Sequence, residues 1–351
     1  MKNITYLLGA GASYNALPIQ QELGEKMIEL ADIMKSLNLK DNSINTIIKN
    51  LKEFGKKALE FGTIDTYARK LSFHKEDVLQ LEKLKKTVSL FFTIWQFVDN
   101  DTTDLKIFKN KEKEDSIIRK AKTIDSRYIS LMATILEKGK ENIKIKDNIN
   151  FVTWNCDLQL ELAVKLFCDE NDKTKSDKWK DFEKVIRFNP AIENGSNLKI
   201  CHLNGFCGYY DIAFKDDKKE NLNVLDIIKA KDIQGILNDI FNNNTKLNYE
   251  SDFNKYINYA WEEENNLTKK TKEQAKQIFE KTDILVVIGY SFPTFNKDTD
   301  KLLFAELKPN VEIYYQGPNA TKDYISQLVK NNQDKILLKK DISYFFLPYD
   351  F

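Results

Sequence analysis

The chain has 351 residues, of which 42% are hydrophobic, and its Lys and Arg residues outnumber Asp and Glu by only 54 to 53. This length and apolar content are enough for a packed core in one large domain or two. The near-neutral charge gives no overall reason to expect nucleic acid or an anionic membrane as a partner. No apolar run reaches the length of about 18 residues that a membrane span needs, and no signal-peptide pattern is present, so we expect a cytoplasmic protein.

Five or six short β-rich runs are predicted, and most of them lack the polar alternation of a strand that is exposed on one face. In chain order they are Ile4–Leu8, Asn150–Thr153, Leu198–Leu203, Ile284–Ile288, Val311–Tyr315 and, as a sixth, Ser343–Leu347. Continuous apolar runs suit strands buried on both faces of a parallel sheet, and the helical patterns between them suit right-handed crossovers. The predicted fold class is α/β, with a Rossmann-like, doubly wound, mainly parallel sheet.

The interval between the first two runs is long and has mostly helical patterns. Apolar residues follow helical spacing at Ile44, Ile47, Ile48 and Leu51, and again from Val88 to Val98. The charged stretch Asn100–Ser116 favours a loop. We therefore predict a single domain over residues 1–351, with a large helical subdomain inserted at 20–148 and the rest of the α/β core at 149–351.

Two further stretches are charged and are expected to be surface excursions, near residues 169–184 and 215–221. Val224–Phe241 has a helical pattern. The aromatic stripe Phe91–Phe97 suits either the core or an oligomer face. The lysine run at 83–86 favours a solvated face, and since no nucleic-acid-binding module is recognisable, direct nucleic-acid binding is not expected.

The cysteines predict free thiols and no metal site. They stand at Cys156, Cys168, Cys201 and Cys207, and no pair has the two-residue spacing of a zinc ribbon. An approach of the last two to one another is left open. Free thiols are the ordinary state of cysteines in a reducing compartment.

Four polar motifs end or follow predicted strands. They are Gly9-Ala-Gly-Ala-Ser13, Thr153-Trp-Asn155-Cys-Asp157, His202-Leu-Asn204-Gly205 and Gly289-Tyr-Ser291-Phe-Pro293. Because ligands of open α/β sheets bind beyond the carboxyl ends of the strands, these motifs are predicted to converge on one crevice. The first motif lies between a strand and a helical pattern that begins near Gln20, which is the arrangement of a phosphate cradle. This indicates a nucleotide ligand.

In type and order, these motifs resemble those of the sirtuin superfamily: a GAG-x-S loop, a T-x-N-x-D segment, an H-x-x-G segment and a G-x-S loop. The segment Thr63–Ala68 is also similar to one in the bacterial anti-phage defence branch of that superfamily. Sirtuin deacetylases continue the first loop into a G-I-P-D-F-R run and carry paired zinc cysteines, both of which this chain lacks. It therefore resembles the sirtuin-like NAD⁺ hydrolases of defence systems more closely than the deacetylases.

The resemblance implies that NAD⁺ is the substrate, that nicotinamide and ADP-ribose are the products, and that no metal takes part. The chemistry of three residues agrees with catalytic roles. Asn155 would hold the ribose hydroxyls and a water, His202 would take a proton near neutral pH, and Asp157 would orient the nicotinamide carboxamide. Loss of nicotinamide develops oxocarbenium character at the ribose, as in glycoside hydrolysis.

Predicted binding residues follow the same strand ends. The pyrophosphate would be held by Gly9, Ala10, Gly11, Ala12 and Ser13, with Thr153 beside them; Gly289 and Ser291 would meet phosphate or the adenosine ribose, and Gly317 and Asn319 would border the adenine.

Each of these sites also has an ordinary structural interpretation. The first glycines suit a tight turn, and Asn155 and Asp157 suit caps of a helix beginning near Leu158. A lone histidine such as His202 is more often a structural residue than a catalyst. Asp65 is either a helix cap, which we favour, or a wall of the site.

The resemblance also implies an abortive-infection effector that depletes NAD⁺ after phage sensing. Such an activity needs control, either by homo-oligomerisation or by a separately encoded partner such as a ring-forming ATPase or an Argonaute-like protein. Two other functions stay open. One is NAD⁺-dependent deacylation or ADP-ribosyl transfer, and the other is a catalytically silent module that senses NAD⁺ or ADP-ribose.

Overall fold

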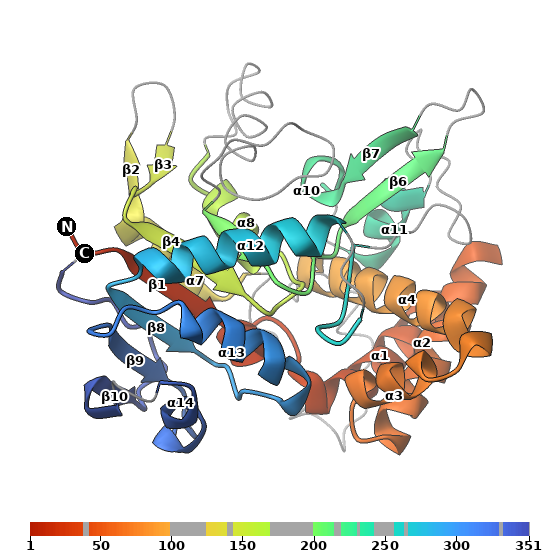
Figure 1. Ribbon diagram of the computed structural model, residues 1–351. Helices are drawn as coiled ribbons and strands as arrows, with labels where there is room; N and C mark the ends of the chain where they lie inside the picture. The colour runs from red at the N-terminus through yellow and green to blue at the C-terminus, as the bar shows by residue number, and fades with distance from the viewer. Residues whose placement is uncertain are drawn as a thin grey trace. The chain divides into compact units, whose positions relative to one another are not determined.

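The computed structural model describes residues 1–37, 42–98, 124–138, 143–168, 199–213, 219–229, 232–241, 256–262, 266–329 and 333–350. The chain forms two compact units, whose elements are labelled in Figure 1. The sheet unit comprises Met1–Ser13, Ser126–Gly205 and Asn258–Phe351, and the helical unit comprises Tyr14–Asp125 and Phe206–Ile257. No helix in these described ranges is both long and apolar enough to cross a membrane.

The sheet unit is built on a six-stranded sheet in the order β10-β9-β8-β1-β4-β5 (Figure 1). Its strands are β1 (Ile4–Leu8), β4 (Ile149–Thr153), β5 (Ile200–His202), β8 (Ile284–Ile288), β9 (Glu312–Gln316) and β10 (Ile336–Lys339). Neighbouring strands pair in parallel throughout. From β1 the chain passes outward to β4 and β5, then returns to β8 on the other side of β1 and continues to β9 and β10. This reversal makes the sheet doubly wound, so the predicted Rossmann-like α/β class is confirmed.

The remaining elements of this unit surround the sheet or extend from it. They are η1 (Ala10–Ser13), α7 (Ser126–Ile135), β2 (Leu136–Lys138), β3 (Ile143–Ile145), α8 (Gln159–Lys165), α12 (Asn266–Lys281), η3 (Thr294–Asn296), α13 (Lys297–Ala305), α14 (Lys322–Leu328) and η4 (Gln333–Lys335). The strands β2 and β3 form a separate antiparallel hairpin.

Both faces of the sheet are buried. On one face, an apolar cluster joins Leu7, Val152 and Val287 to residues of α12, α13 and α14, including Phe279, Phe304 and Ile325. On the other face, the Tyr6 hydroxyl donates to the backbone oxygen of Phe346 at 3.2 Å. The Phe346 ring stacks on Tyr314 with centroids 4.3 Å apart. Burial on both faces accounts for the continuous apolar pattern of the central strands.

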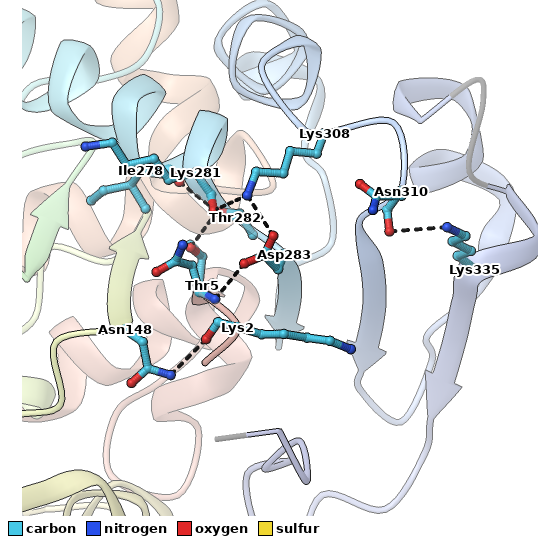
Figure 2. Close-up of polar contacts among 11 residues, drawn as sticks. Lys2, Thr5, Asn148, Ile278, Lys281, Thr282, Asp283, Lys308, Asn310 and Lys335 are labelled. Carbon is cyan, nitrogen blue, oxygen red and sulfur yellow. Dashed lines mark hydrogen bonds and ion pairs between the residues drawn. The ribbon is translucent and has the colours of Figure 1, made fainter.

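The amino edge of the sheet is closed by polar contacts (Figure 2). The hydroxyls of Thr5 and Thr282 lie 2.7 Å apart. The side chain of Asp283 accepts from the backbone N–H of Asn3 at 2.8 Å and from Lys308 Nζ at 2.6 Å. Asn148, just before β4, donates through Nδ2 to the backbone oxygen of Lys2 at 2.8 Å. These side chains pair with one another and with the backbone, and they fix the starts of the strands.

Two predicted strands match the structure at both ends, and one was wrong. Ile4–Leu8 and Ile284–Ile288 coincide with β1 and β8. The predicted strand Ser343–Leu347 is irregular, and the sixth strand is Ile336–Lys339 instead. The reason lies in the buried side chain of Gln316. Its Nε2 donates to the backbone oxygens of residues 341 and 344, at 2.6 and 2.7 Å, and its Oε1 accepts from the backbone N–H of residue 346 at 2.9 Å. The Gln316 side chain thus bonds the backbone groups that a neighbouring strand would otherwise pair with.

The other strands shift slightly, and several predicted segments fall partly outside the described residues. Predicted Asn150–Thr153 gains one residue in β4, Val311–Tyr315 becomes Glu312–Gln316, and Leu198–Leu203 shortens to Ile200–His202. The predicted loop 100–116, the excursion 169–184 and residues 215–218 lie outside the described ranges. Residues 219–221 begin β7 (Lys219–Asn223), which pairs antiparallel with β6 (Tyr209–Ala213). The predicted helix Val224–Phe241 consists of α10 (Val224–Ile227) and α11 (Ile233–Phe241).

The helical unit contains a run of helices in the region whose sequence predicts mostly helical structure. They are α1 (Gln20–Ser36), α2 (Asn42–Glu60), α3 (Ile64–Ser72), the short η2 (Lys75–Asp77) and α4 (Val78–Phe97). In the aromatic stripe of α4, the buried Phe91 stacks on Trp95 with centroids 5.2 Å apart. Residues 126–148 group with the sheet and 206–257 with the helices. The domain boundaries drawn from the sequence stay a prediction.

The favoured interpretation of Asp65 as a helix cap was wrong. The N-cap of α3 is Thr63, whose hydroxyl oxygen accepts from the backbone N–H of Thr66 at 3.2 Å. Asp65 lies inside the first turn, where its carboxylate accepts a hydrogen bond from the side chain of Gln20. Burial raises the pKa of Asp65 to about 6, against the opposing effect of that hydrogen bond.

The loops that follow β1 and β8 are in direct backbone contact. Gly9 N–H donates to the oxygen of Ile288 at 3.0 Å, and Gly11 N–H donates to the oxygen of Gly289 at 2.9 Å. A Cβ on Gly289 would lie 2.3 Å from the nitrogen of Ala12, and the φ of Gly289 is +60°. Both the conformation and the space at position 289 therefore require glycine.

We expect Gly289→Ala to lower the free energy of unfolding by about 3 kcal/mol or more, because a Cβ forces the two loops apart and strains the backbone. Gly317→Ala, after the neighbouring strand β9, is the matched control. Its Cβ would meet only the Cβ of Ala320 at 4.0 Å, so its effect should stay within about 1 kcal/mol. Urea unfolding of both variants measures the difference, and equal stability would contradict the loop contact.

Candidate functional site

The predicted motifs leave the sheet at one level along its carboxyl edge. Leu8, the last residue of β1, is in register with both Thr153 and Ile288, the last residues of β4 and β8. Thr153 is in turn in register with His202, the last residue of β5. The four motifs therefore start side by side from adjacent strands, at the edge where ligands of such sheets bind.

The half-buried side chain of Asn155 is held in a single orientation by the protein. Its Nδ2 donates to the backbone oxygen of Gly9 at 3.0 Å and to Ser13 Oγ at 3.3 Å. Its backbone N–H donates to the hydroxyl of the buried Thr153 at 3.0 Å. In the described part of the chain, no donor is bonded to Asn155 Oδ1. The amide is thus fixed through its nitrogen, and its oxygen stays available as an acceptor.

Ser13 uses its whole hydrogen-bonding capacity within the protein. It is 1% exposed, and its hydroxyl donates to Asp157 Oδ2 at 2.8 Å. Because the hydroxyl has only one proton, the Tyr128 hydroxyl at 3.2 Å must be the donor in their contact. Together with the bond from Asn155, this makes Ser13 the link between the amide and the carboxyl. It faces inward from the loop in which a pyrophosphate ligand was predicted.

Asp157 is buried and has a structural partner as well as its predicted role. Its Oδ1 accepts from the backbone N–H of Gln159 at 3.0 Å, at the start of α8. The N-cap position itself is occupied by Leu158. Burial raises the pKa of Asp157 to about 6, although the hydrogen bonds from Gln159 and Ser13 lower it. Asp157 therefore binds the backbone at the start of α8, as the capping interpretation predicts, and it also binds Ser13.

His202 lies against the same loop and has a buried acidic partner that the sequence reasoning missed. Its Nδ1 is 2.9 Å from the backbone oxygen of Asn155. Its Nε2 is 2.8 Å from Glu161 Oε1, and the two side chains are 3% and 0% exposed. A signal was present in the sequence, since Glu161 interrupts the otherwise apolar segment Leu160–Val164. A charged residue on a buried helix face is almost always paired.

A third buried carboxyl connects the segment after β4 to the segment after β8. Asp300, on α13, accepts from Trp154 Nε1 at 3.2 Å and from the Tyr290 hydroxyl at 2.7 Å. The two rings stack with centroids 6.1 Å apart. Burial raises the pKa of Asp300 to about 7, against the two hydrogen bonds that lower it. No sequence pattern indicates Asp300, which lies 146 residues from Trp154.

The other predicted binding residues differ in accessibility. Gly9, Ala12 and Gly317 are buried, Gly11 and Gly289 are half-buried, and Ala10, Ser291 and Asn319 are exposed. Gly317 and Asn319 follow β9, which is separated from β1 by β8. The exposed and half-buried positions are the ones that a ligand at this edge would meet.

A buried cation lies behind the first glycine loop. Arg127, near the start of α7, donates through Nη2 to the backbone oxygens of Ala12 at 3.1 Å and Gly11 at 3.4 Å. Its guanidinium lies over the ring of Phe345, 5.0 Å from the centroid. The sequence reasoning missed this contact because Arg127 is far from the loop along the chain.

Metal-ligating side chains do not gather in the described ranges, where no group of three or more His, Cys, Asp or Glu residues is close enough to hold an ion. The four cysteines are free thiols. Burial raises the pKa of Cys201 to about 12, which keeps this thiol protonated.

Comparisons with known proteins assign no family. No protein-family model and no curated protein matches the sequence. One solved structure similar to this chain comes from work on the mechanism and regulation of Sir2 enzymes, with 10% identity, coverage of 97% of this chain and 87% of that chain, and a TM-score of 0.38. Another is Sir2 in complex with the inhibitor EX-527, 2'-O-acetyl-ADP-ribose and a deacetylated p53 peptide, with 12% identity, coverage of 98% and 87%, and a TM-score of 0.35. Both TM-scores are too low to carry a functional conclusion.

We expect Asp300→Asn to remove a pH dependence of stability. With its pKa raised to about 7, folded Asp300 keeps a proton that the unfolded chain releases near pH 4. Its contribution to stability is therefore complete below about pH 4 and is lost as the pH rises through about 7. Relative to the variant, the wild type should lose about 1.4 kcal/mol of unfolding free energy for each unit of pKa difference.

Urea unfolding at about pH 4.5 and about pH 7.5 measures this difference. Asp298→Asn, at an exposed position of the same helix, controls for the change in charge. A constant difference between the wild type and Asp300→Asn at the two pH values would contradict the buried state of this carboxyl.

Proposed function

We propose that this chain is an NAD⁺ hydrolase, which cleaves the N-glycosidic bond to nicotinamide and releases ADP-ribose. The observation that carries the proposal is the state of Asn155 at the carboxyl edge of the sheet. Its amide nitrogen is bound to Gly9 and Ser13, and its Oδ1 is left as an acceptor where the four motifs meet. NAD⁺ enters as substrate, and the proposed reaction requires no metal.

The chemistry of the bond favours a fixed amide acceptor. As nicotinamide leaves, positive charge develops on the ribose, and hydrogen bonds to the ribose hydroxyls strengthen in the transition state. An oxygen held in place before the reaction stabilises that state without reorganising. Asn155 Oδ1 has this property because the bonds at Nδ2 prevent the amide from turning. It is suited to accept from a ribose hydroxyl or from the attacking water.

The remaining predicted contacts extend along the same edge. Ala10 and Gly11 present the accessible part of the first loop, and Ser291 and Asn319 are exposed on the loops after β8 and β9. These are the positions proposed for the pyrophosphate, the adenosine ribose and the adenine. Arg127 supports an anionic ligand, because a guanidinium behind the loop attracts phosphate charge through a medium of low dielectric constant.

We further propose that the activity serves anti-phage defence, as an abortive-infection effector that depletes NAD⁺. The support is the resemblance of the motif order, and of Thr63–Ala68, to the defence branch of the sirtuin superfamily. Uncontrolled hydrolysis would harm the host cell. Control by homo-oligomerisation or by a separately encoded partner, such as a ring-forming ATPase or an Argonaute-like protein, therefore belongs to the same proposal.

Asn155→Ala is expected to lower NAD⁺ turnover by about 10²–10³-fold, the usual cost of removing one group that stabilises the transition state. Asn148→Ala is the matched control, because Asn148 precedes β4 as Asn155 follows it, and its bond to Lys2 lies at the opposite edge (Figure 2). The control loses a buried hydrogen bond and some stability, but turnover per folded molecule should stay within about twofold of wild type. Chromatography of NAD⁺ and nicotinamide gives the rates.

Three results would count against this reaction. Turnover by Asn155→Ala at the wild-type rate would remove the role of the amide. Turnover that depends on an added acyl-lysine peptide would favour deacylation, and NAD⁺ binding without turnover in the presence of the natural partner would favour a sensor.

Regulation is tested by following NAD⁺ with the purified chain alone and after co-expression with the proteins of adjacent genes. We expect the rate to rise on assembly or on addition of the partner, and size-exclusion chromatography to show the larger species. A free monomer with full activity would contradict control by assembly.

A further inference from the structure

Both ring nitrogens of His202 are engaged inside the sheet unit. Nδ1 is 2.9 Å from the backbone oxygen of Asn155, and Nε2 is 2.8 Å from Glu161 Oε1. The imidazole and the carboxyl are almost completely buried, at 3% and 0% exposure. A general base must present a nitrogen to the group whose proton it removes. In this structure both nitrogens face the protein.

The partners of the ring determine where its protons lie. A backbone oxygen only accepts, so Nδ1 must carry a proton. A neutral imidazole protonated at Nδ1 has a lone pair at Nε2, which would then face the lone pairs of an ionised carboxylate. The short contact with Glu161 therefore needs one more proton, placed either on Nε2 or on the carboxyl. In both cases the buried pair is neutral overall, which avoids the cost of an isolated charge.

We propose that His202 and Glu161 are a proton-sharing positioning pair for Asn155, and that His202 is not the base of the reaction. The His202 ring binds the carbonyl of Asn155, Thr153 binds its N–H, and Gly9 and Ser13 bind its side chain. These contacts fix the residue on every polar group except Oδ1. Glu161 acts one step further back, by holding the ring so that Nδ1–H points at the Asn155 carbonyl.

The kinetic test of this inference rests on the proposed function. A positioning role and a base role of His202 predict different rates of NAD⁺ turnover in its variants. His202→Asn places an amide N–H where Nδ1–H lies, and this group cannot titrate. Glu161→Gln then removes the carboxylate charge, which would otherwise have lost the histidine as its partner. We expect the double variant His202→Asn/Glu161→Gln to keep NAD⁺ turnover within about tenfold of wild type. His202→Ala should lose about 10²–10³-fold in kcat with little change in KM. Equal losses in the two would overturn the proposal, because a base cannot be replaced by an amide.

Glu161 has its own pair of variants. Glu161→Gln offers an N–H to the lone pair of Nε2 and should keep turnover within about tenfold of wild type, whereas Glu161→Leu leaves Nε2 without a partner and should match His202→Ala. A loss in Glu161→Gln as large as that in Glu161→Leu would overturn the positioning role. Thermal unfolding of each variant measures the folded fraction, to which the turnover is normalised.

A second measurement does not depend on NAD⁺ turnover. The chain has only two histidines, and the other, His74, is exposed, so ¹⁵N-histidine labelling gives two ring systems that a His74→Gln variant assigns. We expect His202 Nδ1 to be protonated at neutral pH, and Nε2 to be unprotonated in Glu161→Gln. A ring protonated at Nε2 with a bare Nδ1 would overturn the pair. The expected protonation in a wild-type protein without NAD⁺ turnover would instead overturn the proposed hydrolysis and leave the pair intact.

Discussion

The contact between the two glycine loops is the constraint on which the rest of the site depends. In a doubly wound sheet, the loops after the two central strands leave in opposite directions and open a crevice. Here the loops after β1 and β8 touch through their backbones, with Gly11 donating to Gly289. The contact fixes the backbone oxygen of Gly9, which is the acceptor that orients the amide of Asn155. The glycines of the first motif thus have a packing role that does not depend on a bound phosphate.

The loops are held by buried acidic side chains, and burial disfavours the ionised form of each. Burial raises the pKa of Asp157 to about 6 and that of Asp300 to about 7, and the Glu161 carboxyl shares a proton with His202 in the proposed pair. An ionised carboxylate close to the edge would repel the phosphates of a dinucleotide, since charges interact strongly at low dielectric constant. The pairing of Glu161 with His202 makes that pair neutral overall, and the hydrogen bonds that Asp157 and Asp300 accept hold their oxygens within the protein. Arg127, behind the first loop, adds charge of the favourable sign.

The sequence predicted those parts of the fold that depend on local pattern. Continuous apolar runs located β1 and β8 to the residue, and the polar motifs marked the edge at which the strands end. The prediction was wrong at Ser343–Leu347, where the apolar pattern favours a strand but a glutamine about 28 residues earlier takes up the backbone groups. Glu161 and Asp300 were missed for a related reason. Their partners, His202 and Trp154, lie 41 and 146 residues away, and no local pattern encodes such a contact.

The proposed reaction makes few demands on acid–base groups of the protein. Nicotinamide leaves as a neutral molecule from a positively charged ring, so its departure needs no general acid. The oxocarbenium-like ribose that remains reacts readily with water, which releases its proton to the solvent. The main demand on the protein is to orient the ribose hydroxyls and the attacking water. The Asn155 amide meets this demand through Oδ1, provided that the loop does not move. In the proposed reaction, charge develops as the leaving group departs, so a neutral pair that holds the loop would act by keeping the Asn155 amide in place.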